Sequence, residues 1–252
     1  MRRHRIVNRI AGAIVLLLCC SGVWSQNTAQ EVPSETALAT MPPERLGDLL
    51  MTQHRYVEAA HVYNRAPVSA VILNKIGVAW HHLSALGEAR HHYEQALQLD
   101  PNYADAMNNL GAVYFAEQNY RKAIHYYQRA LRLAPGSAVY LVNLGTAYFA
   151  ENKTREGEQA YQKALAIDSE VFDLSRGQIV PAAANPRQRA QLDFCVAKLL
   201  AQSGQPDDAL EFLNKAVAAG FTDWHRLMED PALAQLRRTP GFSALVAEMG
   251  AR

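Results

Sequence analysis

Cysteine is almost absent from the sequence, and this scarcity excludes a fold held together by disulfides. The 252 residues contain three cysteines: Cys19 and Cys20 lie in a hydrophobic N-terminal segment, and Cys195 stands alone in the remainder. A single cysteine forms no internal disulfide, so the core must stabilise the fold. Apolar residues at helical spacing surround Cys195, so we expect a small buried core residue rather than a nucleophile.

An excess of positive charge is also missing. Charged residues make up 19% of the chain and hydrophobic residues 49%, a balance typical of a folded protein. The formal net charge of +1 depends on four arginines near the N-terminus. Without residues 1–25, 21 basic residues face 24 acidic ones, and the net charge is −3. Because no basic run provides a surface for phosphate groups, we expect no nucleic-acid partner.

The short motifs of common catalytic sites are absent as well. The sequence has no G-x-x-x-x-G-K, H-E-x-x-H, G-x-S-x-G or C-x-x-C. Histidine is frequent, and His61, His91 and His125 occupy one column of the repeat described below. Equivalent positions on adjacent helices lie about 10 Å apart, whereas zinc ligands lie about 2 Å from the metal. We therefore expect no enzyme, no catalytic residue, no cofactor and no metal site.

The N-terminus has the features of an export signal. Residues 1–9 are basic, residues 10–24 form an uncharged and largely apolar run, and Val23 and Ser25 occupy the positions that a signal peptidase reads. We expect a signal peptide at 1–25, cleaved after Ser25, and a flexible leader at 26–40. The protein would then be periplasmic or secreted.

Two alternatives for this segment stay open. The apolar run is shorter than the roughly 20 residues of a membrane span, yet it could be retained as an anchor. Lipidation at Cys19 or Cys20 is the other alternative. Either would hold the protein at a membrane, and we expect no other contact with one.

The rest of the chain is organised as a repeat of 34 residues. The matching columns are Ile76-Gly77, Leu110-Gly111 and Leu144-Gly145; Trp80, Tyr114 and Tyr148; Tyr93, Tyr127 and Tyr161; and Ala96, Ala130 and Ala164. Apolar residues at helical spacing, with small residues opposite large ones, predict interdigitating pairs of antiparallel helices. Because one pair leaves its own apolar face uncovered, neighbouring pairs must stack on it.

These columns resemble the tetratricopeptide repeat, whose pattern W-x₂-L-G-x₂-Y…A-x₃-F…P spans 34 residues. The resemblance, which extends to exported bacterial members with a C-terminal helical cap, implies an all-α, right-handed superhelical solenoid of tandem antiparallel helix pairs. The expected parts are four units in 41–171 (a degenerate one at about 41–69, then 70–103, 104–137 and 138–171), a loop insertion at 172–189, a fifth helix pair at 190–220 and a helical cap at 221–252. In the cap we expect short helices at 223–229, 231–237 and 240–249, with Thr222 and Thr239 as N-caps.

The resemblance also implies that the first helix of each pair lines a concave groove. The candidate partner-binding residues in the groove columns are Asn74, His81, Asn108, Phe115, Val142 and Phe149. This groove would be aromatic and lightly polar, and it lacks the lysines with which some relatives clamp a C-terminal carboxylate. Phe115 and Phe149 suggest pockets for apolar side chains of an extended peptide or a helix. The alternative is that both pack against neighbouring helices or the insertion.

The sequence thus favours a non-enzymatic interaction scaffold, exported from the cytoplasm, that binds a partner peptide or helix in its concave groove. The partner is a protein or peptide whose identity the sequence does not specify. A membrane-held assembly or pilot factor of a bacterial envelope machine is the second interpretation. An enzyme that uses the histidine-rich second unit is the third.

Overall fold

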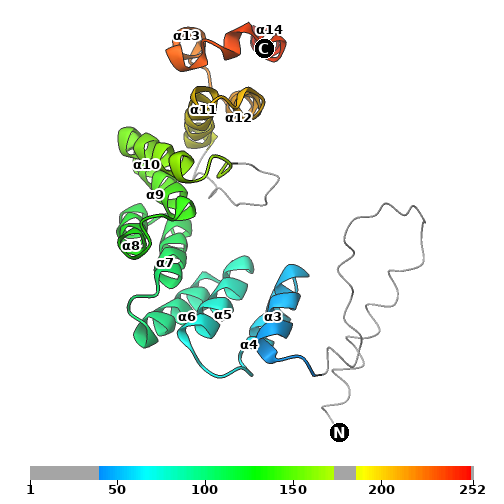
Figure 1. The fold of residues 1–252 in the computed structure, drawn as a ribbon, viewed down its shortest axis with the longest axis vertical. Coiled ribbons are helices and arrows are strands. Elements are labelled where there is room, and N and C mark those ends of the chain that lie inside the picture. Colours follow the sequence, from blue (N-terminus) through cyan, green and yellow to red (C-terminus); the bar gives the residue numbers. More distant parts are fainter. Residues whose placement is uncertain (1–39, 173–185, 251–252) are drawn as a thin grey trace, which may run out of the picture. The chain divides into compact units, whose positions relative to one another are not determined.

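The computed structural model describes residues 40–172 and 186–250, with side chains as far as residue 247 (Figure 1). The expected signal peptide at 1–25, almost all of the leader at 26–40 and most of the insertion at 172–189 lie outside these residues. Every regular element of the described residues is helical. None of these helices is both long enough and apolar enough to cross a membrane.

The chain divides after Val68 into two compact units. The first contains α3 (Pro43–Thr52) and α4 (Tyr56–Tyr63). The helices of the second are α5 (Ala70–His82), α6 (Leu86–Leu99), α7 (Ala104–Ala116), α8 (Tyr120–Leu133), α9 (Ala138–Ala150), α10 (Thr154–Ile167), α11 (Pro186–Gln202), α12 (Pro206–Ala218), α13 (Trp224–Glu229) and α14 (Pro240–Gly250), with the 3₁₀ turns η2 (Pro231–Leu233) and η3 (Leu236–Arg238) before α14.

Helices of the second unit pack in the order of the chain. The pairs are α5 with α6, α7 with α8, α9 with α10 and α11 with α12, and the second helix of a pair contacts the first helix of the next at α6–α7 and α8–α9 (Figure 1). This arrangement confirms the prediction of an all-α solenoid of tandem helix pairs. Each pair covers the apolar side of its neighbour, as stacked repeats require.

The same contact between a glycine and a tyrosine closes each of the first four pairs. The glycine is on the first helix and the tyrosine on the second: Gly47 with Tyr63, Gly77 with Tyr93, Gly111 with Tyr127 and Gly145 with Tyr161. A Cβ atom on any of these glycines would lie only 2.4 to 2.7 Å from a ring carbon. All four tyrosines are at most 1% exposed. The repeated Leu-Gly and Tyr columns of the sequence are therefore the two sides of one packing contact.

The turn inside each pair also has one conformation. His54, Ser84, Gln118 and Asn152 have φ between 57° and 61°, and Gly204 takes this place in the α11–α12 pair with φ 81°. In the α7–α8 turn the Gln118 N–H donates to the Phe115 carbonyl (2.9 Å) and the Asn119 N–H to the Tyr114 carbonyl (2.8 Å). These two bonds are the Schellman arrangement that ends a helix and reverses the chain.

Phe149 packs inside its own helix pair because one residue departs from the repeat. Gly157 on α10 stands where earlier units have alanine, and a Cβ atom at Gly157 would lie 2.7 Å from the Phe149 ring. The ring also contacts that of Tyr161, with centroids 5.4 Å apart, and only 5% of the residue is exposed. Phe149 is thus a core residue between α9 and α10, and the pocket expected at this position is not formed.

The C-terminal elements share a core with α11 and α12. Leu227, Leu233, Leu236 and Phe242 are buried in the same cluster as the two helices. Cys195, the free cysteine of the described residues, is also buried there, and burial raises the pKa of its thiol. The prediction that Cys195 is a core residue is confirmed.

Two local predictions for this region were wrong. The segment expected as a helix at 231–237 is two separate 3₁₀ turns, η2 and η3. The N-cap of α13 is Asp223 rather than Thr222, because the Asp223 carboxylate accepts a hydrogen bond from the Arg226 N–H at 3.0 Å. Thr239 caps α14 as predicted, with its hydroxyl accepting from the Phe242 N–H.

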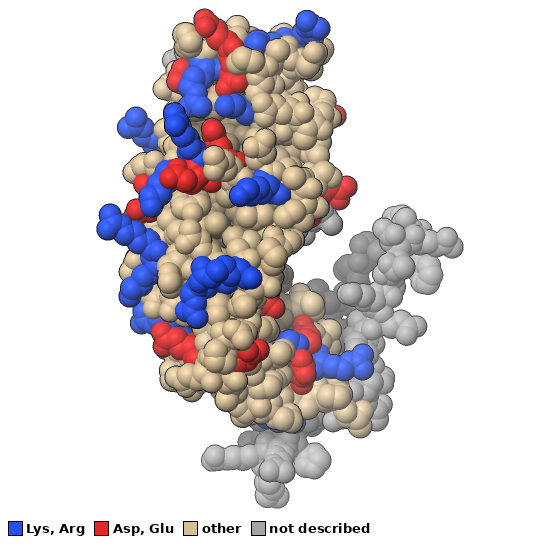
Figure 2. Space-filling view, turned by 60° about the vertical axis from the view of Figure 1, so that its left-hand side comes forward, with Lys and Arg blue, Asp and Glu red and all other residues tan. Residues whose placement is uncertain are grey.

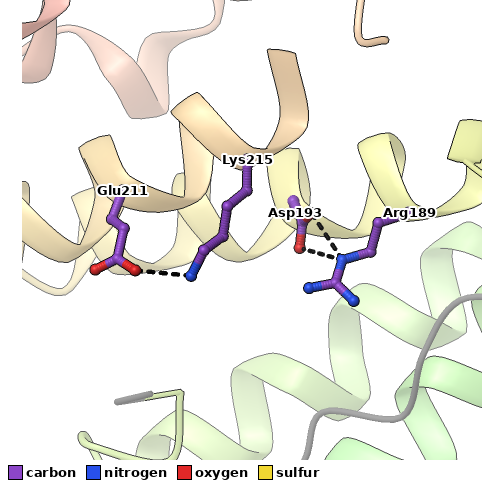
Figure 3. Close-up of polar contacts among 4 residues, drawn as sticks. All are labelled: Arg189, Asp193, Glu211 and Lys215. Atoms are coloured by element: carbon purple, nitrogen blue, oxygen red, sulfur yellow. Dashed lines mark hydrogen bonds and ion pairs between the residues drawn. The ribbon is translucent and has the colours of Figure 1, made fainter. Parts of the chain in front are cut away.

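A buried carboxylate is held by its partner on α11. Arg189 Nε donates to both carboxylate oxygens of Asp193, at 3.1 and 2.9 Å, and the Asp193 side chain is 1% exposed (Figure 3). Burial raises the pKa of the Asp193 carboxyl, and the charge of Arg189 opposes this rise. The second ion pair in Figure 3, between Lys215 and Glu211 on α12, is more exposed, with side-chain exposures of 32% and 56%.

We predict that Gly111→Ala destabilises the protein although alanine favours helices. The new Cβ atom would overlap the buried Tyr127 ring, and such overpacking costs about 1–3 kcal/mol. Gly87→Ala is the matched control, because Gly87 lies on α6 and a Cβ atom there would have no neighbouring atom within 4 Å. The control should gain up to about 1 kcal/mol from helix propensity. Denaturant unfolding gives the free energy of unfolding of both variants. A change in the same direction for the two would contradict the proposed role of the contact between Gly111 and Tyr127.

We also predict that Arg189→Met destabilises the protein in a pH-dependent way. The change leaves the Asp193 carboxylate buried without its partner, at a cost of about 2 kcal/mol at neutral pH, below that of a fully buried pair because Arg189 is partly exposed. The folded-state pKa of Asp193 would rise further above its unfolded value, so stability falls as pH increases between the two values. The loss should therefore be small below about pH 4 and complete once pH exceeds the raised pKa.

The control for this variant is Glu211→Gln, which removes the exposed ion pair of Figure 3 and should cost about 0.5 kcal/mol or less. Unfolding free energies measured between pH 4 and 7 distinguish the two pairs. A loss for Arg189→Met that is independent of pH would show that Asp193 does not depend on its partner.

Candidate functional site

Four asparagine side chains on α5, α7 and α9 form one chain of hydrogen bonds, which we call the asparagine ladder. Asn143 Nδ2 donates to Asn108 Oδ1 at 2.9 Å, Asn108 Nδ2 to Asn109 Oδ1 at 3.3 Å, and Asn109 Nδ2 to Asn74 Oδ1 at 2.9 Å. Asn74, Asn108 and Asn143 are buried, and Asn109 is partly exposed. The ladder therefore joins the first helices of three successive pairs through polar side chains.

A cavity of about 490 Å³ lies along this ladder. Its walls come from α5 (Val78, His81, His82), α6 (Tyr93), α7 (Asn108, Asn109, Ala112, Phe115, Ala116), the following turn (Gln118), α8 (Tyr120, Tyr127) and α9 (Asn143). Four aromatic rings contribute to the walls, and the Phe115 and Tyr120 rings contact each other with centroids 5.3 Å apart. The cavity is thus mainly aromatic and apolar, with polar amides on one side.

The cavity brings together three of the six residues predicted to bind a partner: His81, Asn108 and Phe115. Asn74 lies at one end of the asparagine ladder and reaches the cavity wall only through Asn109. Val142 is buried in the core shared with α11 and α12, and Phe149 is buried between α9 and α10.

The columns taken from the resemblance leave out several wall residues. Asn109 and Asn143 stand one repeat apart, as Asn74 and Asn108 do, so the same comparison of columns could have identified them. The tyrosine column predicts core residues, and this is correct for the rings of Tyr93 and Tyr127, which form the glycine contacts described above. Both tyrosines nevertheless also line the cavity.

Two histidines, His81 and His82, stand on the described walls of the cavity. Among the residues that the structure describes, these walls contain no lysine, arginine, aspartate or glutamate. Burial lowers the pKa of His81, and the neighbouring His82 lowers it further, so the His81 imidazole is neutral at neutral pH. Burial raises the pKa values of Tyr93 and Tyr127, so both hydroxyls keep their protons. The site is suited to recognition by shape and hydrogen bonds rather than by ion pairing.

Charge is distributed differently on the outer surface. On the face that Figure 2 shows, acidic side chains lie among the lysines and arginines instead of leaving one continuous basic area. Arg90 pairs with Glu117 at 3.0 Å and Arg121 with Glu151 at 3.5 Å, which links residues of successive helix pairs. Within the described part of the chain, no three histidine, cysteine or acidic side chains are placed to hold a metal ion.

Comparison with known proteins places this geometry in a family. Residues 68–136 and 102–170 both match the family model described as Tetratricopeptide repeat. No curated protein sequence matches the chain.

Several solved structures are similar to this chain. That of pilF from Pseudomonas aeruginosa has a TM-score of 0.53 at 18% identity and covers 86% of this chain and 90% of its own. The thermophilic TPR protein TTC0263 of Thermus thermophilus has a TM-score of 0.50 at 19% identity, and the match covers 83% of this chain and 98% of TTC0263. MamA from Desulfovibrio magneticus RS-1 has a TM-score of 0.48 at 20% identity, and the match covers 70% of this chain and 92% of the MamA chain.

At these identities, the first two similarities establish the fold and nothing further. The family match and the stacked helix pairs agree on the same residues. Residues 68–170 are therefore tetratricopeptide repeats, within a chain that has the fold of tetratricopeptide repeat proteins.

Proposed function

We propose that this protein is a non-enzymatic scaffold that binds an extended segment of a partner protein along the asparagine ladder and the cavity beside it. The fold fits a protein–protein interaction scaffold. The observation that supports this particular site is the ladder itself, since a row of side-chain amides is chemically matched to a peptide backbone. Each amide group offers both donors and an acceptor, as each peptide unit does.

Spacing favours an extended segment over a helix. Neighbouring helices pack about 8–10 Å apart, and an extended chain rises about 3.3 Å per residue, so three residues span one repeat unit. Asn109 on α7 and Asn143 on α9, which both line the cavity, would then contact the partner's backbone in successive units. The partner's side chains between these contacts would reach the aromatic cavity.

The partner site is tested by photo-crosslinking from the rim of the cavity. Ala116 is exposed at the end of α7 and lines the cavity, so a benzoylphenylalanine at this position should crosslink one main partner in cells. The matched control carries the same group at Leu99, which is 57% exposed and does not line the cavity. A partner captured at 116 and not at 99 is the expected result. Identical products from the two positions would contradict the site.

We further propose that the protein acts outside the cytoplasm. The support is the basic start at residues 1–9, the apolar run at residues 10–24, and Val23 and Ser25 at the positions that a signal peptidase reads. Mature protein isolated from cells should begin at Gln26 on N-terminal sequencing. An acylated cysteine or a retained apolar segment would instead identify a membrane-held protein, and an intact Met1 in the cytosolic fraction would contradict export.

A further inference from the structure

Helix α8 carries an excess of positive charge that its neighbours do not share. It contains no aspartate or glutamate, and its basic residues are Arg121, Lys122, Arg129 and Arg132, together with His125. The adjacent second helices, α6 and α10, each contain two glutamates. The excess of positive charge is therefore confined to α8.

Most of these cations have no acidic partner. Arg121 pairs with Glu151 at 3.5 Å. Lys122, Arg129 and Arg132 form no ion pair with any of the described residues. Lys122 and Arg132 are exposed, and Arg129 is partly exposed. Their charges are thus available to carboxylates of another molecule.

Two of the cations are held in place by aromatic rings. The Tyr114 and Tyr126 rings are stacked, with centroids 5.3 Å apart. Lys122 Nζ lies 4.9 Å from the centre of the Tyr114 ring, and the Arg129 guanidinium lies 5.5 Å from that of Tyr126. A cation over an aromatic face has fewer conformations to lose when a partner binds.

An open apolar groove of about 480 Å³ adjoins this helix, at the junction of α8, α9 and α10 (Figure 1). Its walls are formed by Leu131, Pro135, Leu141, Leu144, Lys163, Ala166 and Ile167. Leu131 directly precedes Arg132 on α8, and Lys163 places a second cation on the α10 side. Among the described residues, these walls contain no acidic side chain. The groove is therefore apolar inside and bordered by positive charge.

A small residue helps to keep this groove open. Ala166 occupies the repeat column in which α8 has Arg132, so the α10 side lacks the long side chain that the preceding unit carries there. Ile167, the last residue of α10, is 49% exposed. An aliphatic side chain placed in the groove would cover apolar surface that is now in contact with water.

These features together specify the chemistry of a partner. Aliphatic walls favour an aliphatic side chain, and the cations beside them favour carboxylates next to that side chain. A broad anionic surface, such as a nucleic-acid duplex or a membrane, would also meet the glutamates of α6 and α10 and be repelled by them. A narrow acidic segment of a protein avoids this repulsion.

We propose that the outer face of α8 and the adjoining groove form a second docking surface, which binds an acidic protein segment with aliphatic side chains between its carboxylates. One aliphatic side chain enters the groove, and Arg132 and Lys163 face the carboxylates on either side of it. This surface shares no residue with the cavity or the asparagine ladder. It therefore does not depend on the function proposed above.

The experiment measures binding of defined peptides to the full-length protein by fluorescence anisotropy. The probe peptide contains glutamates with leucines between them, and two peptides of equal length carry lysine in place of glutamate or serine in place of leucine. We expect the glutamate–leucine peptide to bind about tenfold more tightly than either, since each loses the charges or the aliphatic burial. Raising the salt concentration should weaken this binding.

Three results with these probes would overturn the proposal. The first is no saturable binding of the glutamate–leucine peptide, and the second is equal binding when serine replaces leucine or lysine replaces glutamate. The third is tighter binding of phosphatidylglycerol vesicles or of a DNA duplex than of the glutamate–leucine peptide, which would identify a membrane or a nucleic acid as the partner.

One variant tests the groove. Ala166→Arg fills it with the side chain that α8 has in the same column, and should weaken binding of the glutamate–leucine peptide about tenfold although it adds a positive charge. The matched control is Gln162→Arg, which adds the same charge at an exposed position of α10 outside the groove walls and should not weaken binding. Equal affinity of the two variants would overturn the groove assignment.

Two further variants test the charges. Arg132→Gln and Lys163→Gln should each weaken binding about threefold, the effect of one exposed ion pair. The control is Arg155→Gln, because Arg155 is an exposed cation of α10 that does not line the groove. An equal loss in Arg155→Gln would show that only the overall charge matters and would overturn the proposed surface.

Thermal unfolding checks that these effects are not a loss of folding. All the substituted residues except Lys163, whose side chain also lies at the surface, and Arg132 are on the exposed part of α10, and every variant should melt close to the wild type. Should Ala166→Arg melt early, Ile167→Ser replaces it, since it removes aliphatic surface from the groove at a half-exposed position. Unchanged binding in Ile167→Ser would overturn the groove assignment.

Discussion

The contact between a glycine on the first helix and a tyrosine on the second is the constraint on which the rest of the structure depends. The absent Cβ lets the ring lie against the helix backbone, and this fixes how closely the two helices of a pair approach. In the first and fourth pairs, the tyrosine hydroxyl is hydrogen-bonded to the side chain of the residue that follows the glycine. Packing and polar chemistry are therefore coupled at one place in each unit, and a change beside the glycine alters the hydroxyl without disturbing the ring.

This coupling explains how one repeat can give two kinds of unit. Where Asp48 or Thr146 follows the glycine, the tyrosine hydroxyl is satisfied inside the pair. Where Val78 or Ala112 follows it, the ring packing is retained and an aromatic cavity lies beside the asparagine ladder. A small difference in one column thus separates units whose tyrosine hydroxyl is satisfied internally from units whose tyrosines line the cavity.

The 34-residue columns were enough to predict the helix pairs, because each column is one side of a contact that recurs in every unit. The unit expected at 70–103 contains the pair α5 and α6, at Ala70–His82 and Leu86–Leu99, for this reason. The site was less predictable. A comparison of columns places a residue on a face, but it does not show that Gly157 makes room for Phe149, or that Asn109 reaches across to Asn74. Such contacts join non-equivalent positions of different helices.

At one left-handed turn, backbone strain and the wall of the cavity depend on the same residue. A residue with a side chain is strained at positive φ by about 1 kcal/mol or more, and glycine is not. Gly204 avoids this strain in the α11–α12 pair, but Gln118 accepts it in the turn that borders the cavity. A glycine there would relax the backbone and remove part of the cavity wall. A lower backbone strain and an intact cavity wall are therefore alternatives at this residue.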